Sequence, residues 1–199
     1  ELVRELDDKA DVKCPVGIGT PGTWISNRSA MKNCNSTWLN GRPLLDDLIE
    51  SLSRPVRIAN DADCFALSEA VAGAGQECQC VFGIILGTGV GGGWVMNGRL
   101  RVGPNRLSGE WGHTPLPYFR SDRHTTSAEA DLPDRECYCG RANCVETFLS
   151  GPGFSLTHRL LTGENREADA VAGSEFGERS YALYTSMLAR TLAQIINVI

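Results

Sequence analysis

The sequence predicts an α/β protein, because short apolar stretches of strand length alternate with segments whose apolar residues have helical spacing. Residues 56–59 and 81–86 are such apolar stretches, and the second is continuous, as in a strand buried inside a sheet. A helix is expected over residues 43–52, where proline suits the first turn and leucines recur on one face. Residues 61–73 predict a second helix that follows the first of these strands directly.

Glycines and polar residues separate the other expected elements. We expect a strand at 12–17, a turn at 17–22, a polar loop at 24–41, a hairpin at 94–102, a loop or insertion at 120–136, and helices at 148–161 and 176–199. The Asn97-Gly98 pair within the hairpin is typical of a type I′ turn. The glycines near residue 75 suggest a boundary between two units, residues 1–75 and 76–199.

Composition excludes several classes of protein. The chain has 199 residues and a net charge of −5, from 19 basic and 24 acidic side chains. A nucleic-acid surface needs clustered positive charge, and no run of Lys or Arg here exceeds two residues. The apolar runs are too short to span a bilayer. We therefore expect no nucleic-acid or membrane partner.

Three of the eight cysteines form a candidate metal site. Cys137, Cys139 and Cys144 fall within eight residues, and zinc prefers four nitrogen or sulfur ligands in a tetrahedron. His113, His124 and His158 could supply the fourth ligand. His113 is the preferred candidate because it ends a tight Gly-Glu-Trp-Gly-His loop. The alternative is three reduced thiols without a metal. Three further cysteines, Cys14, Cys34 and Cys64, are expected to be small buried residues.

A glycine-rich loop follows the buried strand at 81–86. Gly87, Gly89 and Gly92 match the dinucleotide pattern on paper, but that pattern must open a helix, whereas this one leads into a hairpin. Successive backbone N–H groups in such a loop can bind phosphate, and the Thr88 hydroxyl adds a donor. The alternative is a flexible hairpin tip. The expected nucleotide contacts are Gly87, Thr88, Gly89, Gly91 and Gly92.

Three carboxylates are candidates for substrate recognition and catalysis. Asp61 follows Asn60 where a strand meets a helix, the edge at which α/β sheets bind ligands. Glu110 and Glu146 lie close in sequence to the expected metal ligands. Such a set would repel a phosphorylated ligand but suits a neutral polyol, and Asp61 could accept the proton of a reacting hydroxyl. The alternative for Asp61 is a helix cap without chemistry.

Taken together, these motifs resemble the ROK family of sugar kinases and repressors. The resemblance rests on Asn60-Asp61-Ala62, the glycine loop at 86–93, the Gly-Glu-Trp-Gly-His segment at 109–113 and the cysteine motif at 137–146. It covers about residues 12–199. Three segments look most like the bacterial fructokinase (manno-fructokinase) branch. They are residues 35–41, Trp111 with residues 115–117, and residues 146–148.

The resemblance implies a ribonuclease-H-like, actin-like ATPase fold with two lobes around a cleft, both incomplete here. It implies Asp61 as the catalytic base. It also implies ATP with Mg²⁺ on the glycine loop and a structural Zn²⁺ on His113, Cys137, Cys139 and Cys144. The implied sugar contacts are Asn60, Glu110, His113, Glu146 and Gly22. The implied reaction is ATP-dependent phosphorylation of a neutral hexose, fructose to fructose 6-phosphate first, with mannose, glucose or N-acetylglucosamine as alternatives.

The sequence departs from the family pattern at several points. Asp63 stands where the family usually has Asn, and Asn143 replaces the usual Gly before the last cysteine. The family's N-terminal phosphate loop and C-terminal adenosine motif are not found, so we expect a fragment that is inactive alone. A sugar-responsive repressor and a sugar-binding module without catalysis remain alternatives. We further expect a cytoplasmic location and a possible homodimer.

Overall fold

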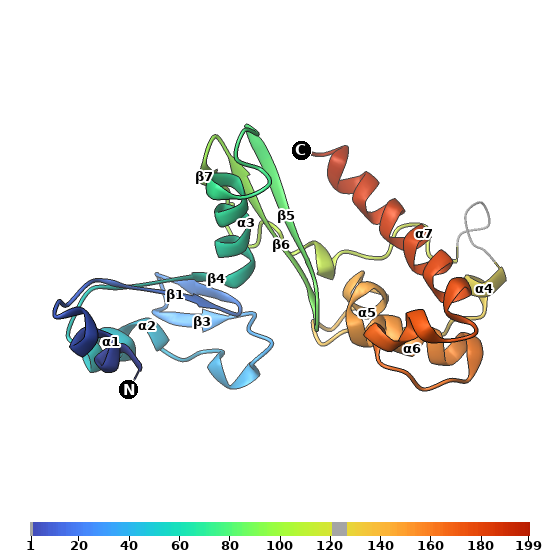
Figure 1. Ribbon diagram of the computed structural model, residues 1–199, viewed down its shortest axis with the longest axis horizontal. Coiled ribbons are helices and arrows are strands. Elements are labelled where there is room, and N and C mark those ends of the chain that lie inside the picture. The colour runs from blue at the N-terminus through green and yellow to red at the C-terminus, as the bar shows by residue number, and fades with distance from the viewer. Residues whose placement is uncertain (1, 121–126) are drawn as a thin grey trace.

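The computed structural model describes residues 2–120 and 127–199 and has a mixed α/β architecture. Figure 1 shows three groups of elements along the long axis, with the β5–β6 hairpin between the N-terminal and C-terminal groups. The first group comprises α1 (Leu2–Ala10), β1 (Val16–Thr20), β2 (Thr23–Ile25), β3 (Ala30–Lys32), η1 (Thr37–Leu39), α2 (Leu44–Leu52) and β4 (Val56–Asn60). The central group comprises α3 (Asp61–Ala72), β5 (Cys80–Leu86), β6 (Val90–Met96) and β7 (Arg99–Leu100). The C-terminal group comprises η2 (Trp111–His113), α4 (Ser127–Ala130), α5 (Glu146–Leu149), α6 (Gly151–Thr162), η3 (Ala168–Gly173) and α7 (Gly177–Ile196).

A parallel pair of strands, β1 and β4, ends beside the candidate site. Val16 pairs with Val56 at one end, and Thr20 pairs with Asn60 at the other. The carboxyl ends of both strands therefore meet at one edge, which is where α/β sheets bind ligands. The expected strand at 12–17 was misplaced, because pairing with β4 draws residues 17–20 into extended backbone.

The segment expected as a polar loop at 24–41 contains a short antiparallel hairpin. In it, Trp24 of β2 pairs with Met31 of β3. Met31 is 2% exposed and Cys34 is also buried, so this hairpin has a small apolar anchor. The expectation of a loop was wrong because the apolar residues of this hairpin are few and polar residues surround them in the sequence.

The central sheet is antiparallel in the order β5-β6-β7, and α3 packs directly on it. A Cβ at Gly83 would lie 2.7 Å from the Cβ of Ala66, and one at Gly93 would lie equally close to it. The helical spacing of Phe65, Ala66, Ala70 and Val71 suggests one buried face, but only Ala66 and Ala70 are buried, whereas Phe65 and Val71 are exposed. Small residues on both surfaces therefore let the helix approach the strands closely. The boundary at residue 75 stays a prediction.

The expected helix at 148–161 is interrupted. It consists of α5 and α6, which are separated at Ser150. The Ser150 hydroxyl accepts a hydrogen bond from Gly153 N at 3.1 Å, and Pro152 lies in the first turn of α6. A serine cap followed by proline starts a new helix. Phe148 and Leu149 of α5 pack with Leu183 and Met187 of α7 in the largest apolar cluster of the described residues.

The turn between β6 and β7 has the expected geometry. Asn97 and Gly98 both have positive φ, 52° and 68°, as a type I′ turn requires. Part of the segment expected as a loop at 120–136, residues 121–126, lies outside the described residues. Across residues 2–120 and 127–199, no helix is both long and apolar enough to cross a membrane.

Candidate active site

A cavity of about 260 Å³ lies where β1, β4, the β5–β6 turn and the cysteine motif meet. Every residue expected to bind sugar or nucleotide lines it: Gly22, Asn60, Asp61, Gly87, Thr88, Gly89, Gly91, Gly92, Glu110, His113 and Glu146. These residues come from segments far apart in the sequence, since Gly22 and Glu146 both contribute. The fold therefore assembles the separate sequence motifs around one space.

Asn60 and Asp61 stand at the start of α3. The Asn60 Oδ1 atom accepts hydrogen bonds from Ala62 N at 2.9 Å and Asp63 N at 3.1 Å, and this caps the helix. Its Nδ2 atom donates to Gly22 O at 3.2 Å. Asn60 thus joins the ends of β1 and β4, while the exposed Asp61 carboxylate lies at the cavity, where the helix dipole favours its negative charge.

The glycine loop is shorter than expected, because β6 begins at Val90 and includes Gly91 and Gly92. The turn itself is Gly87-Thr88-Gly89, closed by a hydrogen bond from Gly87 N to Gly89 O at 2.9 Å. The Gly87 carbonyl accepts from Gly151 N at 2.8 Å, which ties the turn to the start of α6. The turn is therefore anchored at its base rather than being a free hairpin tip.

Glu146 reaches this turn from the other side of the cavity. Its Oε2 atom accepts a hydrogen bond from Val90 N at 2.9 Å. A Cβ at Gly89 would lie 2.7 Å from the same oxygen, which is closer than atoms can pack. Glycine at position 89 is therefore what allows the Glu146 carboxylate to lie against the loop.

The segment that carries Glu110 and His113 is fixed along β6. Trp111 Nε1 donates to Gly91 O at 2.7 Å. A Cβ at Gly109 would lie 2.1 Å from Gly92 O, and one at Gly112 would lie 2.1 Å from Val90 O. Both glycines are needed for this close approach, and Gly109 also has a φ of 91°.

The carboxyl groups around the cavity perturb one another. Burial raises the pKa of Glu110. His113 and Lys32 oppose this rise, whereas the Glu146 and Asp61 carboxylates add to it. Burial raises the pKa of Asp63 to about 6, with added repulsion from Glu110 and Asp61. Asp63 Oδ1 is buried and has no hydrogen-bond partner among the described residues. The cavity is thus a place where negative charge is concentrated and incompletely compensated.

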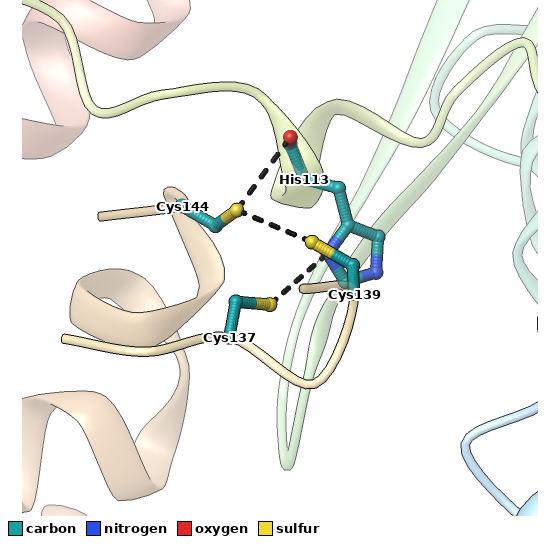
Figure 2. A group of neighbouring side chains, drawn as sticks. All are labelled: His113, Cys137, Cys139 and Cys144. Carbon is teal, nitrogen blue, oxygen red and sulfur yellow. Dashed lines mark hydrogen bonds between the residues drawn. The ribbon is translucent and has the colours of Figure 1, made fainter. Parts of the chain in front are cut away.

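The expected metal ligands come together beside this cavity. Figure 2 shows His113 and the three cysteines converging, with dashed lines from Cys137 to the imidazole and from Cys139 to Cys144. Cys137 Sγ lies 3.4 Å from His113 Nδ1, and Cys139 Sγ lies 3.6 Å from Cys144 Sγ. All four donor atoms lie within 4.8 Å of one another.

These separations fit a tetrahedral zinc site. Zinc–sulfur bonds of about 2.3 Å and zinc–nitrogen bonds of about 2.0 Å place tetrahedral ligand atoms roughly 3.5–3.8 Å apart. Gly140 and Asn143, in the turn that brings the three cysteines together, have positive φ values of 84° and 57°. Burial raises the pKa of the Cys144 thiol to about 12, so without a cation this thiol stays neutral.

Comparisons with known proteins identify the family. The ROK family profile matches residues 1–199. The chain belongs to the ROK family. ROK relatives include the N-acetyl-D-glucosamine kinases of Salmonella paratyphi B and Salmonella typhimurium, each 37% identical over 204 residues. That match covers all of this chain and 66% of each relative. The chain thus spans slightly less than two thirds of the length of these curated proteins.

Solved ROK structures share the fold. The ROK hexokinase from Thermus thermophilus superposes with a TM-score of 0.76 at 25% identity, over 99% of this chain and 63% of that one. A ROK glucokinase from Streptomyces griseus, in complex with glucose and AMPPNP, gives 0.73 at 24% identity, over 99% and 65%. A ROK transcriptional regulator gives 0.71 at 23%, over 100% and 52%. The expected actin-like ATPase fold is thereby confirmed, and the fructokinase branch stays a prediction.

The other candidate histidines and cysteines of this ROK chain lie elsewhere. His158 is buried in α6, where its Nδ1 atom lies 2.8 Å from the Ser180 hydroxyl, and it is not part of the metal cluster. His124 lies outside the described residues. Cys34 is buried as expected, but Cys14 and Cys64 are exposed, and Cys64 is exposed although Ala62 and Ala66 of the same helix are buried.

Two residues near the ROK site, Tyr138 and Arg135, were not expected from the sequence. Tyr138 lines the cavity, and its hydroxyl lies 2.9 Å from His113 Nε2. Its position in the sequence, between the expected metal ligands Cys137 and Cys139, could have indicated that it lies near the site. Arg135 is 5% exposed and donates to the carbonyls of Thr147 and Gly153 at 2.6 and 3.0 Å. A lone arginine in a charged segment carries no sequence signal of burial.

Proposed function

We propose that the full-length protein containing this chain phosphorylates a neutral hexose with ATP, with Asp61 as the general base. The observation that carries the proposal is that the Asp61 carboxylate and the Gly87–Gly89 turn line the same cavity. Phosphoryl transfer requires a positioned hydroxyl, an acceptor for its proton and stabilisation of charge on the phosphate. Asp61 and the turn can meet the last two needs.

The remaining carboxylates support a neutral sugar as the substrate. Glu110 and Glu146 line the cavity with Asp61, and an ionised carboxylate accepts hydrogen bonds only. Sugar hydroxyls can donate to all three groups. A sugar that already carries phosphate or carboxylate would meet concentrated negative charge, so we propose that Asn60, Glu110, His113, Glu146 and Gly22 form an uncharged-sugar subsite.

The nucleotide is proposed to lie on Gly87, Thr88, Gly89, Gly91 and Gly92. Backbone N–H groups of a glycine turn can face phosphate oxygens because no Cβ intervenes. Mg²⁺ bound with ATP would neutralise charge on the phosphates. The chain's own contribution is to hold the nucleotide at the turn and to place Asp61 opposite it.

A structural Zn²⁺ is proposed on His113, Cys137, Cys139 and Cys144. The donor set and its spacing fit this ion, as described above. Glu110 lies three residues before His113, and Glu146 lies two residues after Cys144. A metal that fixes both ligands would hold both carboxylates at the cavity, in the way that supporting interactions orient a functional site.

The order of sugars to assay follows from the relatives. N-acetylglucosamine comes first, because two proteins named as its kinases are 37% identical to this chain. Fructose comes next, on the resemblance of residues 35–41 to the fructokinase branch, followed by glucose and mannose. A panel of these hexoses with ATP and Mg²⁺, assayed on the full-length protein, decides among them.

Asp61→Asn tests the base directly. General-base catalysis contributes about 10²–10⁴-fold, so we expect kcat to fall by at least about 100-fold while sugar binding, measured by calorimetry, is retained. Asp46→Asn, at an acidic position in the first turn of α2, is the control and should leave kcat unchanged. Unaltered turnover in Asp61→Asn would remove Asp61 from the mechanism.

A repressor of the same fold is the alternative function. A ROK transcriptional regulator superposes on this chain at 23% identity, which demonstrates a shared fold only. The intact Asp61 and glycine turn favour the kinase. A full-length protein that binds sugar and DNA but turns over no ATP would support the repressor instead. The two-unit division at residue 75, a homodimer and a cytoplasmic location stay predictions.

A further inference from the structure

The phenol of Tyr138 links the metal centre to the sugar cavity. Its hydroxyl lies 2.9 Å from His113 Nε2, and the two rings meet edge to face, with centroids 5.0 Å apart and an interplanar angle of 89°. The other imidazole nitrogen, Nδ1, faces Cys137 Sγ at 3.4 Å. In this structure His113 Nδ1 faces the thiol cluster and His113 Nε2 faces Tyr138.

Zinc bound to His113 Nδ1, as proposed above, would fix the direction of the hydrogen bond between His113 and Tyr138. A histidine that binds a metal through Nδ1 is neutral and carries its proton on Nε2. The Nε2–H group then donates to the Tyr138 oxygen. The phenol accepts that bond, so its own O–H is left to donate to a further acceptor. Tyr138 therefore offers a hydrogen-bond donor to the cavity that it lines.

The three acidic side chains that face this space offer no such donor. Asp61, Glu110 and Glu146 only accept hydrogen bonds when ionised. Asn60 uses its oxygen to cap α3 and donates from its amide nitrogen to Gly22 O. These groups suit the hydroxyl hydrogens of a sugar, but a carbonyl oxygen on the sugar has no hydrogen to give them. It needs a donor.

We propose that Tyr138 is a specificity-determining residue that donates a hydrogen bond to the acetamido carbonyl of an N-acetylated hexose. The inference rests on the proposed sugar-kinase function and names the substrate class of the same site. The Thr88 hydroxyl and the amides of Asn33 and Asn35 also line the cavity and can donate hydrogen bonds. Unlike them, Tyr138 is held by His113, so the direction of its donor is set before the sugar binds.

Tyr138→Phe in the full-length protein tests this, because it removes the hydroxyl and keeps the ring against His113. Dissociation constants for N-acetylglucosamine and glucose are measured by calorimetry without ATP. Loss of one hydrogen bond at a site built for it weakens binding by about ten-fold, and this is expected for N-acetylglucosamine only. Glucose affinity should change by less than about two-fold. Zinc content should be unchanged.

Each other outcome overturns the inference. These outcomes are equal weakening for both sugars, no weakening for either, loss of zinc in Tyr138→Phe, or a selective loss that appears in Asn35→Ala instead. Tyr181→Phe, on α7 and away from the cavity, is the matched control and should bind both sugars normally. A parent protein that does not bind N-acetylglucosamine but phosphorylates glucose would end the inference and leave the proposed function intact. A parent that phosphorylates no hexose would end both.

Discussion

The ionised carboxylate of Asp63 destabilises the folded protein, and replacing Asp63 with asparagine should remove this destabilisation. Its pKa is raised from 3.8 to about 6, first by burial and then by repulsion from Glu110 and Asp61. Its Oδ1 atom has no hydrogen-bond partner among the described residues. The Asp63→Asn substitution would keep the shape of the side chain and remove the charge, as in the family pattern.

The size of the effect follows from the pKa. The displacement from 3.8 to about 6 corresponds to roughly 3 kcal/mol at neutral pH. The side chain is only partly buried, and solvent screening reduces this to about 1–2 kcal/mol. The folded state keeps the proton up to about pH 6, whereas the unfolded chain releases it near pH 4. The parent protein, which carries Asp63, therefore loses folding stability as the pH rises through this window.

Denaturant unfolding of the parent and of Asp63→Asn at several pH values measures this. At pH 4 the two proteins should be equally stable within error. Above pH 7 Asp63→Asn should be more stable by about 1–2 kcal/mol. Asp8→Asn, at an exposed position on α1, serves as the control. A variant that is less stable than its parent at pH 7.5, or a difference independent of pH, would refute the reasoning.

Two further changes test the metal centre and the turn. Cys139→Ser should lower bound zinc from about one ion per chain to near zero, measured by metal analysis, while Cys80→Ser, an exposed cysteine outside the cluster, should not; equal zinc in both would remove Cys139 from the site. Gly89→Ala should push the Glu146 carboxylate off Val90 N, because the added Cβ would lie 2.7 Å from Glu146 Oε2. The KM for sugar should then rise by about ten-fold in steady-state assays. Gly17→Ala, where a Cβ meets nothing within 4 Å, is the control, and a normal KM in Gly89→Ala would contradict the contact.

The candidate site was more predictable from sequence than the elements that carry it. Metal ligands, acids and glycines are chemically distinctive residue types, and those expected at the site line one cavity or one donor cluster. The boundaries of strands are set by pairing instead. The start of β1 is decided by its register with β4, which no pattern within residues 12–20 could reveal.

The glycines of β6 illustrate a second limit. Gly91, Gly92 and Gly93 were expected in a loop because glycine disfavours regular strands. In the structure they belong to β6, where a Cβ at Gly93 would lie 2.7 Å from the Cβ of Ala66. The cost of glycine in the strand is offset by close packing of α3. The alanines at 62, 66 and 70, spaced four residues apart, could have indicated the face of α3 that packs on the sheet.

The backbone contacts of Gly109 and Gly112 with β6 have a consequence for how this protein tolerates change. A side chain at either position would collide with a carbonyl oxygen of the strand, so neither can be exchanged without lifting the whole segment. Lifting it would displace Glu110, the proposed sugar contact, and His113, the proposed metal ligand, together. Gly109 and Gly112 should therefore be among the least replaceable residues of the chain, and substitution of either should impair sugar recognition and zinc retention together.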